Sequence, residues 1–200
     1  MQKEKRFDAK NGIQIMIRPA NPDDSCAILN TVRSNALERS YVLMEQYGKD
    51  IAAEREYISG LDSKRNLLIV AAAASDLVGC LAALQADAGM RSETQHIVHI
   101  GLHLSEPFRG LGIGPKLLEY SIEWADAMGF KKIQANIFTT NRRSLSLFSK
   151  AGFVEEGVRQ NRIRMGSHYV NEVLMGKMLQ TQAGPDESRA FNQSLHRGAA

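Results

Sequence analysis

The sequence predicts a mixed α/β domain built around one central sheet. Blocks with strand periodicity and blocks with helical periodicity follow one another as strand, two helices, three strands, helix, strand, helix and two strands. Of the 200 residues, 44% are hydrophobic and 24% are charged, which is typical of a globular chain. A chain of this length encloses one substantial core without disulfides.

The first strand and two helices are expected before residue 60. IQIMIRPA predicts a strand that ends at Pro19. Pro22-Asp23-Asp24 then predicts the start of a helix, because acidic side chains interact favourably with the positive end of the helix dipole. A second helix is expected over roughly Asp50–Ser59.

Three strands are expected next. LLIVAAAA and LVGCLAALQADA predict a hairpin around Ser75-Asp76. The same polar pair interrupts Leu67–Leu84, the most membrane-like window, so this window is interpreted as two buried strands. After a polar turn over Gly89–Thr94, HIVHIGLHL alternates histidine and aliphatic residues, which is typical of a strand.

The remaining elements are marked by their capping residues. PKLLEYSIEWADAM predicts a helix that ends before Gly129. KKIQANIF predicts a strand, and NRRSLSLFSKAG a short helix with Asn141 as its N-cap and Gly152 just beyond its end. FVEEGVRQ and HYVNEVLMGKML predict the last two strands.

The expected organisation is a flexible leader over residues 1–12, one domain over 13–179 and a disordered tail over 180–200, which is polar and aperiodic. The N-terminal segment is charged and lacks an apolar stretch, which predicts no signal peptide. Cys26 and Cys80 have no metal-site or redox-site spacing and are expected to be buried, reduced thiols of a cytoplasmic protein. A net charge of +3 is too small to indicate a nucleic-acid partner.

RGLGIGPKLL, at residues 109–118, places glycines where a strand gives way to a helix. Free N–H groups and the helix dipole make such a turn an anion site, and glycines allow close approach of phosphates. A P-loop is excluded because Pro115 follows Gly114, and the same proline breaks a GxGxxG fingerprint. The pattern Arg/Gln-x-x-Gly-x-Gly/Ala is complete. A tight structural turn with no ligand remains the alternative.

This pattern resembles the pyrophosphate-binding turn of the GNAT superfamily of N-acetyltransferases. NRRSLSLFSKAGF, residues 141–153, is similar to the family's second signature. The resemblance covers about residues 13–179. It implies a mostly antiparallel, twisted sheet that is splayed in the middle and flanked by about four helices. It also implies transfer of an acetyl group from acetyl-CoA to a primary amine (small amine, polyamine or protein N-terminus) in a ternary complex, and a homodimer paired through the last strands.

The resemblance also implies cofactor contacts. Pantetheine is expected to pair with backbone groups of Leu102 and Leu104 beside His103, and Asn141 and Phe148 are expected to contact the same arm. The pyrophosphate is expected on the turn formed by Arg109, Gly110, Leu111, Gly112, Ile113 and Gly114. The basic residues expected near the phosphates are Lys116, Arg142, Arg143 and Lys150.

The sequence departs from the family at both acid–base positions. Phe148 stands where a tyrosine acid is usual, and Asn136 where some members have a glutamate base; neither side chain carries a proton for transfer. The candidate replacements are His103 as base through water and Tyr169 as acid, followed by His99 and Glu106.

The acceptor is expected against the connection between the first two helices. Glu38, Tyr41, Glu45 and Tyr47 there would suit a cationic amine. Two other classes stay open: a non-catalytic acyl-CoA-binding module, favoured by Phe148 and Asn136, and a nucleic-acid-binding protein based on Arg159, Arg162 and Arg164.

Overall fold

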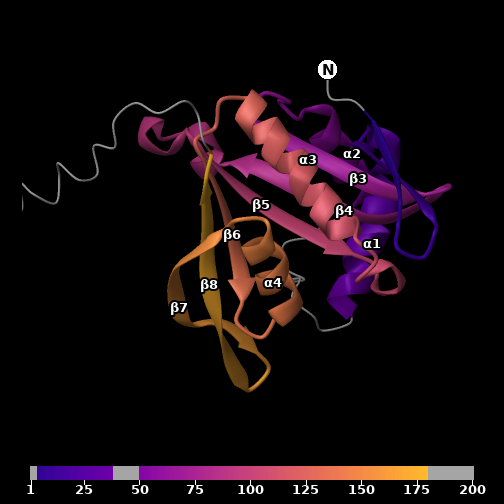
Figure 1. The fold of residues 1–200 in the computed structure, drawn as a ribbon. Coiled ribbons are helices and arrows are strands. Elements are labelled where there is room, and N and C mark those ends of the chain that lie inside the picture. Colours follow the sequence, from indigo (N-terminus) through magenta and orange to yellow (C-terminus); the bar gives the residue numbers. More distant parts are fainter. Residues whose placement is uncertain (1–3, 38–49, 180–200) are drawn as a thin grey trace, which may run out of the picture.

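The structure, a computed structural model, describes residues 4–37 and 50–179. Within these residues one eight-stranded sheet runs in the order β1-β2-β3-β4-β5-β6-β8-β7 (Figure 1). The strands are β1 Lys5–Asp8, β2 Gln14–Pro19, β3 Asn66–Ala73, β4 Asp76–Gln85, β5 Ile97–Leu104, β6 Lys132–Phe138, β7 Val154–Met165 and β8 His168–Met178. The α-helices of the described part are α1 Ser25–Leu37, α2 Ile51–Ser59, α3 Ile113–Ala127 and α4 Arg142–Lys150. This architecture confirms the predicted fold class and, apart from the additional strand β1, the predicted element order.

The N-terminal segment differs from the predicted flexible leader. Residues 5–8 form β1, which pairs antiparallel with β2, and Phe7 packs partly buried against the core. Lys5 also bonds Glu123 and lies 5.3 Å from the centre of the Tyr120 ring. A single apolar residue in four was too weak a pattern to indicate this edge strand. The tail predicted over 180–200 lies outside the described residues.

Helices α1 and α2 cover one face of the sheet, and α3 covers the opposite face (Figure 1). Leu68 and Val70 of β3 pack with Ile28 and Val32 of α1 in one buried cluster. The alternate residues Leu67, Ile69 and Ala71 of β3 pack with α3 in the larger cluster, because successive side chains of a strand point to opposite faces. Both faces of β3 are therefore buried, which explains its nearly continuous apolar sequence.

The membrane-like window, Leu67–Leu84, forms the β3–β4 hairpin as predicted. In the described part of the chain, no helix combines the length and apolar character needed to cross a membrane. Both cysteines are free. Cys80 is buried as expected, but Cys26 is exposed, because it lies in the first turn of α1 on the side away from the sheet.

The sheet is antiparallel except where β5 meets β6. These strands run parallel and pair only from Ile97–His99 with Lys132–Gln134. Beyond these residues β5 continues along β4, while β6 continues along β8 as far as Phe138. The two strands consequently diverge and leave two facing edges unpaired, which is the splay expected from the family resemblance.

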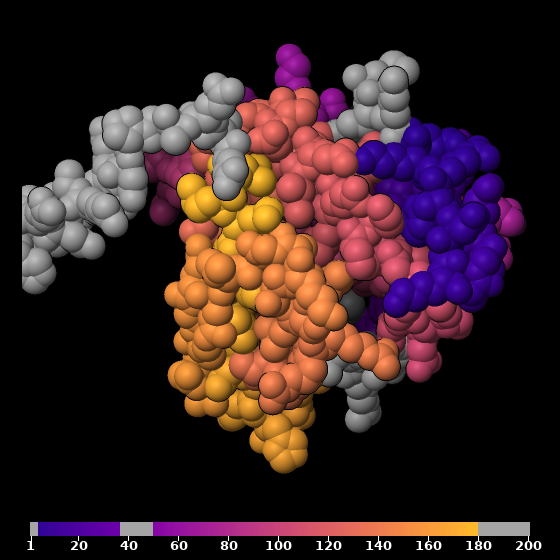
Figure 2. All heavy atoms as spheres, viewed as in Figure 1, coloured from indigo at the N-terminus to yellow at the C-terminus, as the bar shows by residue number. Residues whose placement is uncertain are grey.

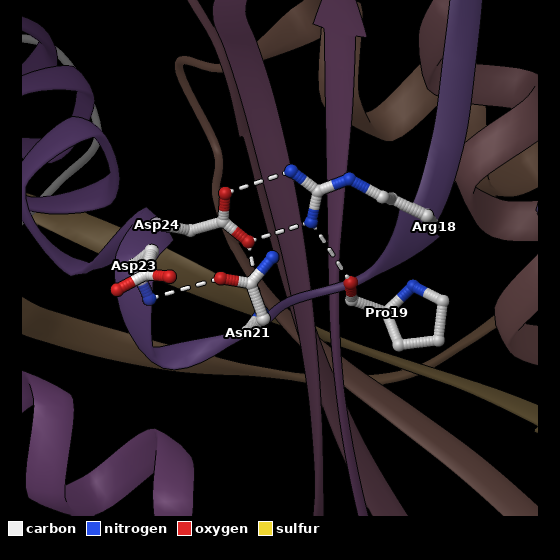
Figure 3. A network of polar contacts seen from close by, with 5 residues as sticks. All are labelled: Arg18, Pro19, Asn21, Asp23 and Asp24. Carbon is white, nitrogen blue, oxygen red and sulfur yellow. Dashed lines mark hydrogen bonds and ion pairs between the residues drawn. The ribbon is translucent and has the colours of Figure 1, made fainter.

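An ion-pair network fixes the start of α1 against the end of β2 (Figure 3). The Arg18 guanidinium donates to both carboxylate oxygens of Asp24 at 2.6 and 2.8 Å and to the Pro19 carbonyl at 3.1 Å. The Asn21 N–H donates to the same carboxylate at 2.8 Å, while the Asn21 side chain accepts from the Asp23 N–H at 2.9 Å. This reciprocal capping sets the direction in which the chain enters α1.

We expect Asp24→Asn to remove a pH-dependent part of the free energy of unfolding. Burial raises the pKa of Asp24, but the hydrogen bonds from Arg18 and the Asn21 N–H outweigh it and lower this pKa below 3.8. A lowered pKa stabilises the fold above the unfolded-state value, and this contribution is lost as pH falls through the folded-state value. Urea unfolding of the wild type and the variant between pH 7 and 3 measures the difference.

The neighbouring Asp23→Asn is the matched control, because the Asp23 side chain is 86% exposed and pairs with Arg55 at 3.1 Å. An exposed pair of this kind contributes little. We therefore expect the difference in free energy of unfolding between Asp24→Asn and wild type to be largest near pH 7 and to decrease in acid. A difference of equal size at every pH would refute the assignment.

Candidate active site

The connection from β5 to α3 presents a run of free backbone amides. A 3₁₀ turn over Glu106–Phe108 leads into the glycine turn, where Gly110 and Gly112 have φ values of +78° and +90°. Throughout the described residues, no acceptor is found for the N–H groups of residues 110 to 114. The first amides of a helix have no partner inside it, and α3 begins here at Ile113. The turn thus combines free donors with the positive end of the α3 dipole.

The two glycines are required by backbone conformation and leave space above the amides. Among the described residues, a Cβ built on Gly110 would meet no atom within 4 Å, and one on Gly112 would meet only the Lys10 side chain at 4.0 Å. Positive φ values favour glycine over residues with a Cβ. Atoms of residues 4–37 and 50–179 therefore leave the space beside these two glycines open.

The unpaired edge of β5 carries further backbone groups. The His96 carbonyl accepts hydrogen bonds from the N-terminal end of β6 at 2.9 and 3.2 Å, whereas the Ser105 N–H donates to β4 at 2.9 Å. Because backbone groups alternate sides along a strand, those of Leu102 and Leu104 point toward the gap between β5 and β6. This orientation matches the predicted pairing with an extended ligand. The Leu104 carbonyl already accepts from Arg109 Nε at 2.9 Å, which leaves Leu102 with the more accessible pair.

A cleft of about 1420 Å³ joins the turn, the gap and the space beneath α1 and α2. Figure 2 shows the surface hollowed where the orange α4 segment meets the salmon segment between β5 and α3. The cleft is lined by most of the predicted cofactor residues, namely Leu102, His103, Leu104, Arg109, Gly110, Gly112, Gly114, Asn141 and Phe148. Leu111 and Ile113 instead pack against the core, so these two offer only backbone groups.

Several basic side chains also line the cleft. Arg142, Arg143 and Lys150 line it as predicted. Lys116 does not, because it pairs with Glu119 at 2.7 Å on the exposed side of α3. Lys10 lines the cleft instead, and its N–H donates to the Leu111 carbonyl at 3.1 Å. No sequence pattern indicated Lys10, which reaches the turn only because β1 and β2 fold beside it.

The Arg109 side chain lies away from the amides of its own turn. Its guanidinium donates to the Leu104 carbonyl and to the side chain of Asn35, a residue only 2% exposed on α1. Arg109 therefore joins the end of β5 to α1. In this position the Arg109 side chain shapes the turn, and the hydrogen-bond donors that the turn itself presents to the cleft are its backbone N–H groups.

His103 points from β5 toward the α1–α2 side of the sheet and meets Cys80. Its Nε2 lies 3.2 Å from the Cys80 Sγ. Burial and, to a smaller extent, the Arg109 charge lower the pKa of His103 to about 4, while burial raises the pKa of Cys80 to about 12. The pair is thus a neutral imidazole beside a neutral thiol at physiological pH. An imidazole of this pKa suits hydrogen bonding better than removal of a proton from an ammonium group.

We expect the His103 ring to remain neutral from pH 8 down to about pH 5. Imidazole resonances followed by NMR, assigned with a His103→Asn variant, test this. Because the folded-state pKa lies below the unfolded value of about 6.5, unfolding takes up a proton between the two. The contribution of His103 to stability therefore falls as pH decreases from 6.5 toward 4. A midpoint near 6.5 in the folded protein would contradict the burial argument.

Asn141 and Phe148 both line the cleft. The Asn141 side chain accepts the Ser144 N–H at 3.1 Å, which confirms the N-cap, and the residue also borders the cleft. Phe148 is 2% exposed and meets Phe153 edge-on, with ring centres 5.0 Å apart. Asn136 lies on the β6 wall of the cleft. The two positions where the family pattern places an acid and a base thus carry a phenyl ring and an amide.

The remaining candidate acids and bases, His99, Tyr169 and Glu106, do not all lie at the cleft. His99 lines the cleft, and burial, opposed by Asp87, lowers its pKa. Tyr169 is 61% exposed on β8 opposite Arg164, and neither it nor the exposed Glu106 is among the residues that line the cleft. The structure therefore separates the predicted acid from the predicted base. The acceptor residues expected at 38, 41, 45 and 47 lie outside the described residues.

The arginines considered for nucleic-acid binding contact groups of their own β7–β8 hairpin. Arg159 pairs with Glu172 at 2.9 Å, and Arg162 lies 3.9 Å from the same carboxylate. Arg164 donates to the Gly166 carbonyl at 3.1 Å. These contacts are those of side chains that stabilise the β7–β8 hairpin.

Glu54, which was not among the predicted site residues, lines the cleft from α2 and is only 5% exposed. A signal existed: Ile51, Glu54 and Ile58 recur at helical spacing, so the carboxylate interrupts the apolar side of the helix. Tyr57 and Asn35 line the same part of the cleft.

Comparison with known proteins gives a family match. The family model described as "Acetyltransferase (GNAT) family" matches residues 34–153, which is more than half of the chain. YwnH of Bacillus subtilis (strain 168), a candidate phosphinothricin acetyltransferase, is 31% identical over 80 residues. That alignment covers 40% of this chain and 49% of YwnH, so the chain matches about half of that relative's length.

Solved structures share the fold. The acetyltransferase of GNAT family from Streptococcus pneumoniae superposes with a TM-score of 0.77 at 22% identity, over 83% of this chain and 99% of that one. A GNAT superfamily phosphinothricin acetyltransferase from Sinorhizobium meliloti, solved in complex with acetyl-CoA, superposes with a TM-score of 0.75 at 22% identity, over 86% and 94%. The acceptor-free amides at the N-terminal end of α3 and the splay between β5 and β6 agree with this match. The family match establishes that this chain belongs to the acetyltransferase (GNAT) family.

Proposed function

We propose that this chain transfers an acetyl group from acetyl-CoA to a primary amine by direct attack in a ternary complex. The observation that carries the proposal is the run of five amides, residues 110 to 114, which have no acceptor within the described residues. Three of these residues, Gly110, Gly112 and Gly114, line the cleft. Such a run suits a diphosphate, which offers several negatively charged oxygens close together. The relative from S. meliloti was solved with acetyl-CoA, which supports the same ligand here.

The chain's own residues supply the rest of the cofactor site. Lys10, Arg142, Arg143 and Lys150 lie where phosphate charge needs neutralisation. The Leu102 backbone faces the gap and can pair with the amides of the pantetheine arm as a neighbouring strand would. Asn141 and Phe148 border the same passage. Acetyl-CoA would supply an activated thioester, and these residues would hold it along the gap between β5 and β6.

The proposed reaction is aminolysis of that thioester. The ammonium first loses a proton to solvent. The free amine nitrogen then forms a bond to the acyl carbon and the C–S bond breaks; the nitrogen releases a second proton to solvent, and the leaving thiolate of the coenzyme takes one up. The Leu102 N–H is placed to polarise the acyl oxygen. Alignment of both reactants in one cleft supplies up to roughly 7–11 kcal/mol in ideal cases. His103 is proposed to hold the acceptor or a water by hydrogen bonding, as a neutral group.

The runner-up is a module that binds acyl-CoA without catalysis. The specific observation in its favour is that Phe148 and Asn136 fill the family's acid and base positions.

For the enzyme, we propose the reducing cytoplasm as the location, since both cysteines are free thiols.

Two measurements separate these proposals. Calorimetric titration with acetyl-CoA tests the cofactor site, and release of free CoA thiol tests turnover with spermidine, phenethylamine, phosphinothricin and an alanyl peptide. We expect binding, and turnover with at least one amine. Binding without turnover would favour the non-catalytic module, and absence of binding would overturn both.

A further inference from the structure

The turn between β1 and β2 lies directly against the glycine turn. The Lys10 N–H donates to the Leu111 carbonyl at 3.1 Å. The Lys10 Cγ lies 4.0 Å from the position that a Cβ on Gly112 would take, and it is the nearest described atom outside the glycine turn itself. Lys10 also lines the cleft. Figure 2 shows the indigo N-terminal segment beside the salmon segment that leads into α3. The β1–β2 hairpin therefore contributes a lysine to the cofactor cleft.

The turn that carries Lys10 has a defined backbone. The Ala9 N–H donates to the Ile13 carbonyl and the Gly12 N–H donates to the Ala9 carbonyl, both at 2.8 Å, and Gly12 has a φ of +80°. Ala9 is buried and belongs to the larger core cluster. These contacts fix the backbone of Lys10, so a ligand would have to order only its side chain.

The Lys10 ammonium group has no carboxylate partner among residues 4–37 and 50–179. Other lysines in these ranges do pair with glutamates, namely Lys5, Lys116 and Lys132. An ammonium group without such a pair keeps its donors available to a ligand. Because it lies beside backbone amides that also need an acceptor, the two kinds of donor together favour an anion with several oxygens.

The hairpin and α4 approach the glycine turn at different residues. A Cβ on Gly114 would meet the Leu147 side chain at 3.1 Å, which places α4 next to Gly114, whereas Lys10 lies next to Gly112. Apart from Arg109, the other lysines and arginines in the described lining of the cleft belong to α4, namely Arg142, Arg143 and Lys150. Lys10 thus reaches the turn separately from the basic residues of α4. A group held on the turn would lie next to Lys10.

We propose that Lys10 binds the diphosphate of acetyl-CoA, so that the β1–β2 hairpin forms part of the cofactor site. The proposal rests on the proposed function, and it assigns Lys10 to the diphosphate rather than to the 3′-phosphate of the ribose. A hydrogen bond between an ammonium group and a phosphate oxygen is charge-assisted and therefore stronger than one between neutral groups. Lys10 would add a full positive charge to the neutral amides of the turn.

The test measures the Kd of two ligands by calorimetric titration. Acetyl-CoA carries the diphosphate and the 3′-phosphate, whereas acetyl-3′-dephospho-CoA carries the diphosphate alone. We expect Lys10→Gln to weaken the binding of both ligands by the same factor, about tenfold or more, which is the loss expected for a hydrogen bond to a charged group. Lys10→Arg retains the charge and should bind both ligands more tightly than Lys10→Gln does.

Lys5→Gln is the matched control, because it removes the same charge from the same hairpin outside the site. Lys5 lies on β1, pairs with Glu123 and is not among the described residues that line the cleft. An exposed ion pair of this kind contributes little to stability, so we expect wild-type Kd values for both ligands. Equal loss of affinity in Lys5→Gln and Lys10→Gln would indicate a general effect of charge and would overturn the proposal.

Three results with the Lys10 variants would also overturn the proposal. The first is a Kd of Lys10→Gln equal to that of the wild type. The second is a loss seen with acetyl-CoA but not with acetyl-3′-dephospho-CoA, which would assign Lys10 to the 3′-phosphate. The third is equally weak binding by Lys10→Arg and Lys10→Gln. All three leave the proposed function intact, whereas absence of acetyl-CoA binding by the wild type would overturn the proposed function together with this inference.

Discussion

Replacement of Gly112 by valine is expected to weaken acetyl-CoA binding at least about 100-fold. Gly112 has φ +90°, and its N–H is one of the amides open to the cleft. A branched side chain at this position would stand over those amides and move the turn toward negative φ. Loss of two hydrogen bonds to charged phosphate oxygens, each about 1.5–3 kcal/mol, exceeds the 2.7 kcal/mol or so that corresponds to 100-fold. Calorimetric titration gives the Kd.

Gly129→Val is the matched control for this variant. Gly129 has φ +83° and no neighbour within 4 Å of a built Cβ, but it lies at the opposite end of α3. Both substitutions carry a similar backbone strain of about 1–2 kcal/mol, so both should lower the free energy of unfolding by comparable amounts. Only Gly112→Val should lose acetyl-CoA. Equal loss of binding in the two variants would indicate general destabilisation rather than a blocked site.

Replacement of Trp124 by alanine is expected to cost about 3–5 kcal/mol in the free energy of unfolding. Trp124 is 3% exposed and attaches the last turns of α3 to the sheet. Its ring centre lies 5.4 Å from that of Phe130, and its Nε1–H donates to the Ser63 carbonyl at 3.2 Å. Alanine would leave a cavity where the ring packs and an unpaired carbonyl at Ser63. Denaturant unfolding measures the change.

Trp124→Phe separates the two contributions. Phenylalanine retains most of the apolar volume but cannot donate to Ser63, so its expected cost is about 1–2 kcal/mol. Because α3 also carries the glycine turn at its other end, the folded fraction of Trp124→Ala should still bind acetyl-CoA. If Trp124→Ala cost less than about 1 kcal/mol, Trp124 would not be an anchor of α3.

The sequence was sufficient for the elements whose ends carry their own chemical signals. Asn141 caps α4 through the Ser144 N–H, and Gly129 follows α3 with a positive φ, both as predicted. α3 itself begins at Ile113, two residues before the expected start, because Gly112 takes the N-cap position with no side-chain cap. Local capping fixes a helix end closely, but a glycine N-cap carries no side-chain signal.

Tertiary contacts explain the remaining differences. β1 is a strand because β2 offers it an edge and Phe7 meets the core, which four residues alone do not indicate. Lys10 reaches the turn through that same pairing. Arg109 bonds the Leu104 carbonyl and the Asn35 side chain; because Asn35 lies on α1, the loop motif alone did not indicate this contact. Glu54 was visible only as an interruption of an apolar helix face.

The most direct test of the central claim is a titration of ¹⁵N-labelled protein with acetyl-CoA, followed through its backbone amide resonances. If the turn binds the diphosphate, the amides of Gly110, Gly112 and Gly114 should show the largest shifts, and pantetheine without the diphosphate should leave them nearly unchanged. Saturable binding of acetyl-CoA that leaves these three amides unperturbed would contradict the account.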